Sequence, residues 1–468
     1  TLTTVDAGSS LTVNDATGNP TVELTNGAST SVGSVNVGTA SNGTVNILSG
    51  STLDAATATV GTTGNGTLTV GGASSAASIT GNLHVGTTGS VNVETGGSLD
   101  VGSVSMSSGA SLTMAGGTLT SAATFLDLPA SATIVGHGTV DTAFRGGLDS
   151  YLTANGGVLS VGDTMSFLGF STNGTLQADV DSTLQLQSRG FAQLGPITLM
   201  NGGTIEADNG IVLGTGKVID GHGDVAGAVA ADFGSIINAS GGDLSVGTNA
   251  ASDGFFSDGR LYTNNLGVTL LDKNEAVLGS LTVLGTTNED GTLTVPNSAL
   301  LEAGKNVEGR GTIEGDFENQ GTVEGDSTDD RITFAAGYTV TGAGEGINVA
   351  YDGVYKPGNS PGVVNPTNSQ YNNLVEMELG GTTPGSGSGN HDQINDQLTL
   401  EFGVNSILDV VSYEGFIPSA GDEFVLFTWQ TALVGDFSQI LYDPLFADNG
   451  VFFTVNIINP TGPGEYVL

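Results

Sequence analysis

The feature that most constrains this chain is a short motif that occurs three times at nearly equal spacing. Gly-His-Gly-Thr-Val at residues 136–140 returns as Gly-His-Gly-Asp-Val at 221–225 and as Gly-Arg-Gly-Thr-Ile at 309–313, so the copies start 85 and 88 residues apart. Repetition on this scale is typical of architectures in which similar units stack on one another. The motif therefore predicts an elongated, stacked fold that acts through its surface.

A shorter repeat lies inside the long one. Apolar pairs in a background of Gly, Ser, Thr and Asn begin at Leu83, Val91 and Leu99, and again at Val104 and Leu112. Each unit of about eight residues is typical of a short strand whose alternate side chains point inward. Because one such strand cannot bury its own apolar face, we expect the units to wind into a β-solenoid. A sandwich has similar strand spacing, but its strands usually differ from one another, whereas these resemble each other.

Composition agrees with an all-β fold. Stretches with apolar residues at helical spacing are scarce, and the 75 glycines follow no three-residue period, which excludes a collagen-like chain. The sequence has no cysteine. It also has no run of about 18 to 20 apolar residues that could span a bilayer, so we predict no membrane insertion.

The charge balance excludes several kinds of partner. The chain has 48 acidic and 9 basic residues, a formal net charge of −39, and no Lys or Arg before Arg145. Without a basic stripe it cannot neutralise phosphates, so we predict no nucleic-acid binding. Copies of such an acidic chain repel one another, and we therefore expect divalent cations or salt to favour any self-assembly.

Aromatic residues predict the domain organisation. None of the 28 Phe, Tyr and Trp residues occurs in the first 120 positions, while 13 lie between Tyr371 and Tyr466, which indicates a thicker C-terminal core. Two prolines at 357 and 361 mark a passage where the chain should leave the stack. We predict a narrow solenoid at 1–124, a wider solenoid with the three long repeats at 125–353, a Pro/Gly-rich connection at 354–370, and an antiparallel β-sandwich or jelly roll at 371–468 that caps the stack.

Several strings in the C-terminal third resemble a known family. Residues 355–362 read Tyr-Lys-Pro-Gly-Asn-Ser-Pro-Gly and follow the repeat Gly-x-Gly-Thr-Ile-x-Gly-Asp-Phe-x-Asn-x-Gly-Thr-Val at 309–323. With 415–424 and 434–437, they resemble PEP-CTERM-type exported surface proteins with autotransporter-passenger-like repeats, over roughly residues 300–468. The resemblance implies a right-handed parallel β-helix, exported by a signal peptide and sorted to the cell surface or extracellular matrix. The Pro-Glu-Pro sorting signal does not occur in this sequence, and sorting would remove it.

One acidic cluster is a candidate metal site. Asp326, Asp329 and Asp330 lie in a Gly-rich loop and could bind Ca²⁺ through carboxylate oxygens. Their spacing matches neither an EF-hand nor the nonapeptide repeats that bind calcium. A solvated acidic loop is the alternative, and we predict no other cofactor.

Catalytic patterns are weak, and we predict that the chain is not an enzyme. His137 and His222 are equivalent positions of the long repeat, but the third copy carries Arg310, which argues against a shared ligand role. Residues 385–389 spell Gly-x-Ser-x-Gly only inside a flexible loop, where a strained nucleophile could not be held. A polysaccharide lyase or hydrolase would need a basic residue beside a carboxylate cluster.

The ends of a solenoid suggest a function. They expose strand edges that can pair with another copy. We expect the N-terminal coil, with Leu2 and Val5 at the interface, to contact the C-terminal domain of the next copy; such a head-to-tail contact does not close and makes a fibre. The prediction is an exported structural protein of an extracellular filament, sheath or biofilm matrix, with itself and extracellular polysaccharide as candidate partners. The alternatives are a monomeric adhesin or glycan-binding stalk, and a polysaccharide lyase or hydrolase.

Overall fold

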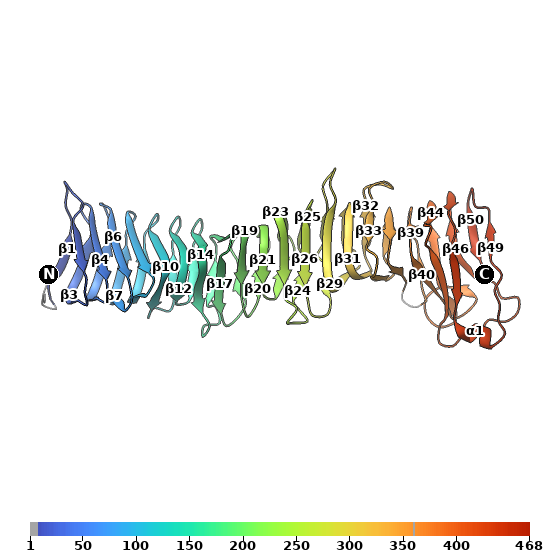
Figure 1. The fold of residues 1–468 in the computed structure, drawn as a ribbon, viewed down its shortest axis with the longest axis horizontal. Helices are drawn as coiled ribbons and strands as arrows, with labels where there is room; N and C mark the ends of the chain where they lie inside the picture. Colours follow the sequence, from blue (N-terminus) through green and yellow to red (C-terminus); the bar gives the residue numbers. More distant parts are fainter. Residues whose placement is uncertain (1–7, 359–360) are drawn as a thin grey trace. The chain divides into compact units, whose positions relative to one another are not determined.

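The computed structural model describes residues 8–358 and 361–468, and nearly all of its regular structure is β-strand (Figure 1). The chain divides into two compact units, unit 1 at residues 1–230 and unit 2 at residues 231–468. The boundary at 230 falls inside the region that the sequence assigned to a wider solenoid.

Unit 1 consists of strands joined by short turns. Their bounds are β1 (Ser10–Val13), β2 (Thr21–Leu24), β3 (Ser29–Val37), β4 (Gly43–Leu48), β5 (Thr52–Val60), β6 (Gly66–Gly71), β7 (Ser75–Val85), β8 (Gly89–Glu94), β9 (Gly97–Met106), β10 (Ser111–Ser121), β11 (Leu126–Leu128), β12 (Thr133–Asp141), β13 (Phe144–Gly146), β14 (Tyr151–Asp163), β15 (Phe170–Thr172), β16 (Thr175–Asp179), β17 (Thr183–Ser188), β18 (Ala192–Gln193), β19 (Ile197–Glu206), β20 (Ile211–Leu213), β21 (Val218–Ala226) and β22 (Val229–Ala231) at its boundary.

The strands of unit 1 form parallel ladders between successive coils. Thr21 of β2 lies opposite Thr44 of β4, which lies opposite Thr67 of β6. Side chains that meet across this ladder, such as Asn46 and Glu23, are 23 residues apart in the chain. Because each coil returns the chain to the same register, every backbone hydrogen bond of the ladder joins one coil to the next. This arrangement is the parallel β-solenoid that the sequence predicted.

Long strands bend at glycines and belong to two sheets. In β14, residues 151–154 pair with β16, and residues 158–163 pair with β17. The two segments are joined through Gly156 and Gly157, whose φ angles are 78° and 151°. Glycine adopts such angles without a steric penalty, so the chain can turn a corner without ending the strand.

The repeated Gly-His-Gly motif forms the same kind of corner. Gly221 has a φ of 130°, and a Cβ atom placed on it would lie 1.8 Å from the carbonyl oxygen of Met200 in the preceding coil. Gly309 has a φ of 111°, and its Cβ would lie 2.1 Å from the carbonyl oxygen of Leu284. The motif therefore recurs because the backbone turns there in close contact with the previous coil.

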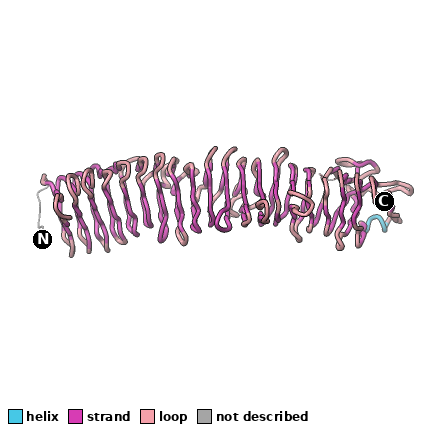
Figure 2. Tube along the Cα trace, turned by 90° about the horizontal axis from the view of Figure 1, so that it is seen from above, coloured by secondary structure: helices cyan, strands magenta, loops and turns pink. Residues whose placement is uncertain are grey.

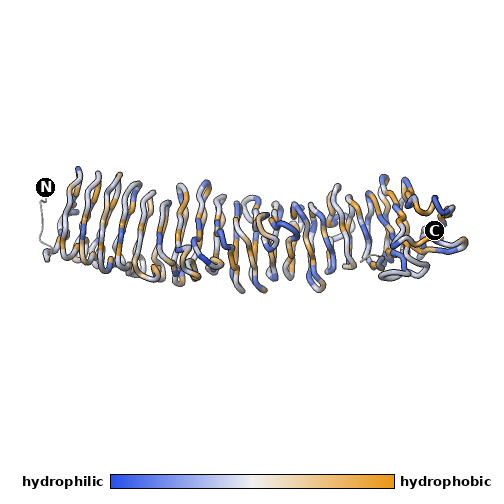
Figure 3. Tube along the Cα trace, turned by 90° about the horizontal axis from the view of Figure 1, so that it is seen from below, coloured by the Kyte–Doolittle hydropathy of each residue, from blue (hydrophilic) through white to orange (hydrophobic). Residues whose placement is uncertain are grey.

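The core of unit 1 is a ladder of aliphatic side chains. Val45, Leu68, Val91, Leu112 and Ile134 occupy the same register position in successive coils and are each at most 3% exposed. Figure 3 shows apolar segments recurring from coil to coil, separated by polar ones. The predicted inward stacking of the short repeats is confirmed.

Unit 2 contains the remaining strands and one helix. Their bounds are β23 (Ile236–Gly247), β24 (Phe255–Ser257), β25 (Arg260–Asn264), β26 (Gly267–Leu271), β27 (Ala276–Val277), β28 (Leu281–Leu284), β29 (Gly291–Leu301), β30 (Asn306–Gly309), β31 (Gly311–Asn319), β32 (Thr322–Gly325), β33 (Ile332–Phe334), β34 (Thr339–Thr341), β35 (Glu345–Ile347), β36 (Val349–Tyr351), β37 (Val354–Tyr355), β38 (Val363–Val364), β39 (Gln370–Tyr371), β40 (Leu374–Leu379), β41 (Thr383–Pro384), β42 (Asn390–His391), β43 (Gln393–Asp396), β44 (Thr399–Phe402), β45 (Ile407–Ser412), β46 (Val425–Trp429), β47 (Ala432–Val434), β48 (Gln439–Tyr442), α1 (Pro444–Asp448), β49 (Asn456–Ile458) and β50 (Gly464–Val467).

An aromatic ladder fills the core of unit 2. Phe317, Phe334, Tyr351, Tyr371 and Phe402 follow one another through the coils, and the centroids of neighbouring rings are 5.1, 5.4, 5.1 and 6.1 Å apart. Rings at these separations interact beyond simple burial. The thicker C-terminal core expected from the aromatic residues is therefore built from rings stacked between coils.

The C-terminal region differs from the predicted antiparallel sandwich in its strand direction. β40, β45 and β48 pair in parallel, so the solenoid continues through much of this region. A second, five-stranded sheet has the order β38-β43-β46-β50-β49, and its pairs β46–β50 and β49–β50 are antiparallel. The sandwich prediction is thus correct for a second sheet with antiparallel strands but wrong for the rest. Alternation of apolar and polar residues is the same in both kinds of pairing, so the period could not distinguish them.

The coils of this last region are longer than those of unit 1. Thr428 and Asn395, which hydrogen-bond across neighbouring coils, are 33 residues apart in the chain. Figure 2 shows α1, the one helix of the described residues, near the C-terminus. It begins after Asp443, whose side chain accepts a hydrogen bond from the backbone N–H of Leu445. An aspartate at this position satisfies an N–H group that the helix cannot.

Candidate functional site

The predicted assembly residues Leu2 and Val5 lie outside the described residues, and the first strands that the structure describes are β1 and β2. β1 pairs with β3 and β2 pairs with β4, and no other described strand pairs with either of them. β1 reads Ser-Leu-Thr-Val and contains neither a charge nor a proline. We call β1 and β2 the N-terminal edge of unit 1.

Unit 2 also has strands with one unpaired side. Within the described part of the chain, β48 pairs with β45 alone and β49 pairs with β50 alone. Neither strand contains a charged residue or a proline. All three residues of β49 are exposed, and the exposed fractions of Ile457 and Ile458 are 37% and 49%. We call β48 and β49 the C-terminal edge of unit 2.

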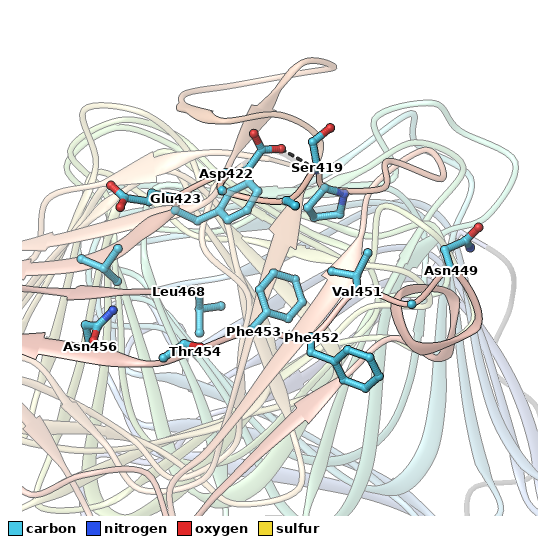
Figure 4. Close-up of a pocket in the computed structure, with 16 residues that line it drawn as sticks. Ser419, Asp422, Glu423, Asn449, Val451, Phe452, Phe453, Thr454, Asn456 and Leu468 are labelled. Atoms are coloured by element: carbon cyan, nitrogen blue, oxygen red, sulfur yellow. Dashed lines mark hydrogen bonds between the residues drawn. The ribbon is translucent and has the colours of Figure 1, made fainter.

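A hollow of about 580 Å³ adjoins β49 (Figure 4). Phe453 lines it and packs against Phe424 and Tyr442, with ring centroids 6.3 and 5.1 Å away. On its rim, the carboxylate of Asp422 accepts a 2.7 Å hydrogen bond from the backbone N–H of Ser419. Apolar and polar residues both line the hollow, as they do a protein contact surface.

The three candidate calcium ligands differ in their surroundings. Asp330 forms a 2.7 Å ion pair with Arg310, whereas Asp326 and Asp329 are exposed. Among the residues that the structure describes, no three or more His, Asp or Glu side chains are grouped so that they could hold a metal ion. A cation at this loop would compete with Arg310 for Asp330. Calcium binding by Asp326, Asp329 and Asp330 stays a prediction.

Two arginines stand beside this acidic loop, and the sequence analysis missed the site that they form. Arg310 also binds Asp290, with 2.7 Å between Nε and the carboxylate. Arg331 donates to the backbone carbonyl of Thr328 and forms a 3.3 Å ion pair with Glu401. Together they line a polar groove of about 330 Å³ on the outer face of β31, β33, β36 and β39. The sequence did contain one indication of this site, because the third repeat has Gly-Arg-Gly where the first two have Gly-His-Gly.

The electrostatics of the groove argue against arginine acting as a base. The hydrogen bond that Arg310 donates to Asp290 and the negative charge of Asp330 raise the pKa of Arg310 above its usual value. Burial lowers the pKa of Arg331, which keeps Glu401 as its counter-ion. Arg310 is therefore held as a cation by two carboxylates, and Arg331 is paired with the carboxylate of Glu401.

Two buried aspartates near the Pro/Gly-rich passage were also missed. Asp392 accepts hydrogen bonds from the backbone N–H groups of Gly362 and Glu378, and burial raises its pKa to about 8. Asp396 accepts from the backbone N–H groups of Ser369 and Leu398, and burial also raises its pKa. These carboxylates join turns of the wide coils to the second sheet. No sequence period marks them, because their role depends on which backbone N–H groups the fold leaves unpaired.

The histidines occupy structural positions. His137 packs against Gly157, and His222 packs against Gly202, at equivalent corners of the stack. His391 is buried, and its ring nitrogens are 3.1 and 3.4 Å from the carbonyl oxygens of Gly381 and Val425. Burial lowers its pKa, which favours the neutral ring.

No protein-family model matches the chain, and no curated protein matches it significantly. Among the described helices and strands, there is no helix long and apolar enough to cross a bilayer.

Proposed function

We propose that this chain is an exported structural protein whose copies join head to tail into an extracellular filament, sheath or biofilm matrix. The observation that carries the proposal is the pair of unprotected edges, one at the N-terminal side of unit 1 and one at the C-terminal side of unit 2. Strand edges usually carry lysine, proline or a bulge that prevents pairing with another chain. β1, β48 and β49 carry neither a charge nor a proline, and β2 carries one charged residue, Glu23.

The contact would add the N-terminal edge of one copy to the C-terminal edge of the next. Main-chain hydrogen bonds supply affinity in such strand addition, and side chains beside the strand supply specificity. Ile457 and Ile458 would be covered in the contact, as would the hollow that Phe453 lines. Since the two surfaces differ, the contact is heterologous and does not close on itself, which produces a fibre.

Charge distribution favours this mode over side-by-side association. The first 120 residues contain six acidic residues and no basic one, so most of the net charge of −39 lies elsewhere. Copies that approach through the N-terminal edge therefore meet less repulsion than copies that approach through the acidic coils. Divalent cations or salt would screen the repulsion that remains.

Export and surface location rest on the resemblance of residues 300–468 to exported surface proteins. The proposal assigns the chain no catalytic activity. In its support, Arg310 and Arg331, the basic groups beside the acidic loop, are held by carboxylates and carbonyl groups and are not available as general bases.

Electron microscopy of the purified chain, with and without millimolar Ca²⁺, tests the proposal. We expect filaments with a regular axial repeat, favoured by the cation. The double variant Ile457→Lys with Ile458→Lys places charge on β49 and should abolish filaments, and Leu2→Asp with Val5→Asp should do the same at the other end.

Val180→Lys is the matched control, because Val180 is 64% exposed in a turn of unit 1 and belongs to neither edge. It should leave the filaments intact. Circular dichroism should show that every variant keeps its β structure. Isolated molecules under both conditions would refute head-to-tail assembly, and filaments that survive both double variants would refute these edges as the contact.

A further inference from the structure

The polar groove beside Arg310 has a floor that repeats from coil to coil. Thr312, Thr333, Ala350 and Gln370 lie opposite one another in register on β31, β33, β36 and β39. Their neighbours along the row are about 4.8 Å apart, which is the spacing of adjacent strands. Ala350 is the smallest side chain of the row and lines the groove.

The walls of the groove are held by contacts that do not involve a ligand. Arg310 is held by Asp290 and Asp330 on one side. On the other side, the side-chain amide of Asn372 donates a 2.7 Å hydrogen bond to Asp352. Groups fixed in this way lose little conformational freedom when they bind a ligand.

We propose that this groove binds a segment of an uncharged polysaccharide. Carboxylate, guanidinium and primary amide groups are planar, and each can bond two adjacent hydroxyl groups of a sugar ring at once. Asp352, Arg310, Gln370 and Asn372 supply all three kinds of group, and Thr312 and Thr333 add hydroxyls along the floor. The volume of about 330 Å³ is within the range of small-ligand sites.

Charge decides between a neutral and an anionic polysaccharide. The groove is lined by Asp290, Asp329, Asp330 and Asp352 against the two arginines, so negative charge is in excess. Both arginines are already paired with carboxylates. A uronate or sulfated chain would be repelled, whereas hydroxyl groups donate readily to surplus carboxylate oxygens.

A steric variant with a matched control tests the groove. Thr333→Trp fills the floor, and Thr322→Trp introduces the same ring at an outward position of β32, which does not line the groove. The probes are immobilised neutral oligosaccharides (gluco-, manno-, galacto- and N-acetylglucosamine series) and uronate oligomers, with the strongest neutral probe then titrated by calorimetry. We expect Thr333→Trp to weaken binding roughly tenfold or more and Thr322→Trp to leave it unchanged.

Asp329→Ala provides a second test that does not fill the groove. Asp329 is exposed and lines the groove, so this variant should keep the fold and weaken binding to a smaller degree. Binding to none of the neutral probes, binding to uronates alone, or equal binding by Thr333→Trp and wild type would each overturn the proposal. This test is independent of filament assembly, because the substitutions that test the groove are not those that test β49.

Discussion

The coils near the N-terminus and those near the C-terminus use the same parallel ladder but fill and close it differently. In unit 1, Val45, Leu68 and Val91 form an aliphatic ladder in coils of about 23 residues. In the last coils, Tyr371 and Phe402 lie opposite each other in the core, and the coil between them takes 31 residues. Phe334 and Tyr351 also lie opposite each other, only 17 residues apart. The same hydrogen-bonded ladder therefore accepts aliphatic and aromatic cores, and coil length alone does not decide between them.

Turns near the N-terminus and turns beside the second sheet use different acceptors. In unit 1, the hydroxyl of buried Ser51 accepts from the backbone N–H of Ala28, and that of buried Ser75 accepts from Gly50. In unit 2, the carboxylates of Asp392 and Asp396 have this role. A hydroxyl group does not titrate near neutral pH, so we expect the turns at Asp392 and Asp396 to be more sensitive to pH than the turns at Ser51 and Ser75.

The largest expected effect is a loss of stability when the aromatic ladder of unit 2 is interrupted. Tyr371→Ala should lower the free energy of unfolding of unit 2 by about 4 kcal/mol, because the ring packs between Tyr351 and Phe402 and leaves a cavity. Urea unfolding followed by the fluorescence of Trp429, the single tryptophan, measures this loss, since that residue is buried in unit 2. Tyr371→Phe retains the ring and should change stability by less than about 1 kcal/mol. Equal losses in both variants would show that ring stacking is not the source.

The next largest expected effect is a pH dependence of stability that arises from the buried carboxylate of Asp392. The pKa of Asp392 is about 8 in the fold against 3.8 in an ordinary environment, so the folded state binds this proton more tightly. The stabilising contribution of Asp392 should therefore be complete below about pH 4 and be lost as the pH rises to about 8. In the unfolded chain, the many other carboxylates also raise the pKa of Asp392. The free energy lost between pH 4 and pH 8 is therefore smaller than the full difference in pKa would give, and is on the order of 3 kcal/mol.

Asp392→Asn should flatten that profile for unit 2, measured by urea unfolding with Trp429 fluorescence at several pH values. Asp448→Asn, at an exposed position of α1, is the control for the loss of one charge and should leave the slope in place. A profile of the Asp392 variant as steep as that of the wild type would assign the pH dependence to other groups.

The smallest expected effect is a gain in the stability of unit 1. Thr198 follows Leu176 in the aliphatic ladder, is fully buried, and its hydroxyl has no hydrogen-bond partner among the described residues. Thr198→Val removes this unsatisfied group at nearly constant volume and should stabilise the surrounding coils by about 1 kcal/mol. Slower exchange of the backbone amide hydrogens of β19 would show this stabilisation. Faster exchange would mean that the hydroxyl has a partner in solution.

Much of the fold could be predicted from the sequence, but little of the candidate sites could. The apolar alternation at Leu83, Val91 and Leu99 predicts strands whose side chains stack inward, and all three are buried. The groove was not predicted, because Arg310 and Asp290 lie 20 residues apart in the chain and meet only when neighbouring coils align. Asp330 is a second example. Its acidic sequence neighbours suggested a metal ion as its partner, but in the folded chain it forms an ion pair with Arg310.

The sequence by itself determined the parallel stack and its corners. A period of apolar residues decides which side chains are buried, and glycine is required wherever the backbone turns against the carbonyl of the preceding coil, as at Gly221. Tertiary structure alone decided the direction of strand pairing beyond β40 and the partners of buried Asp392. Those outcomes depend on contacts between residues distant in the chain, which leave no local period, so they exist only once the coils are in register.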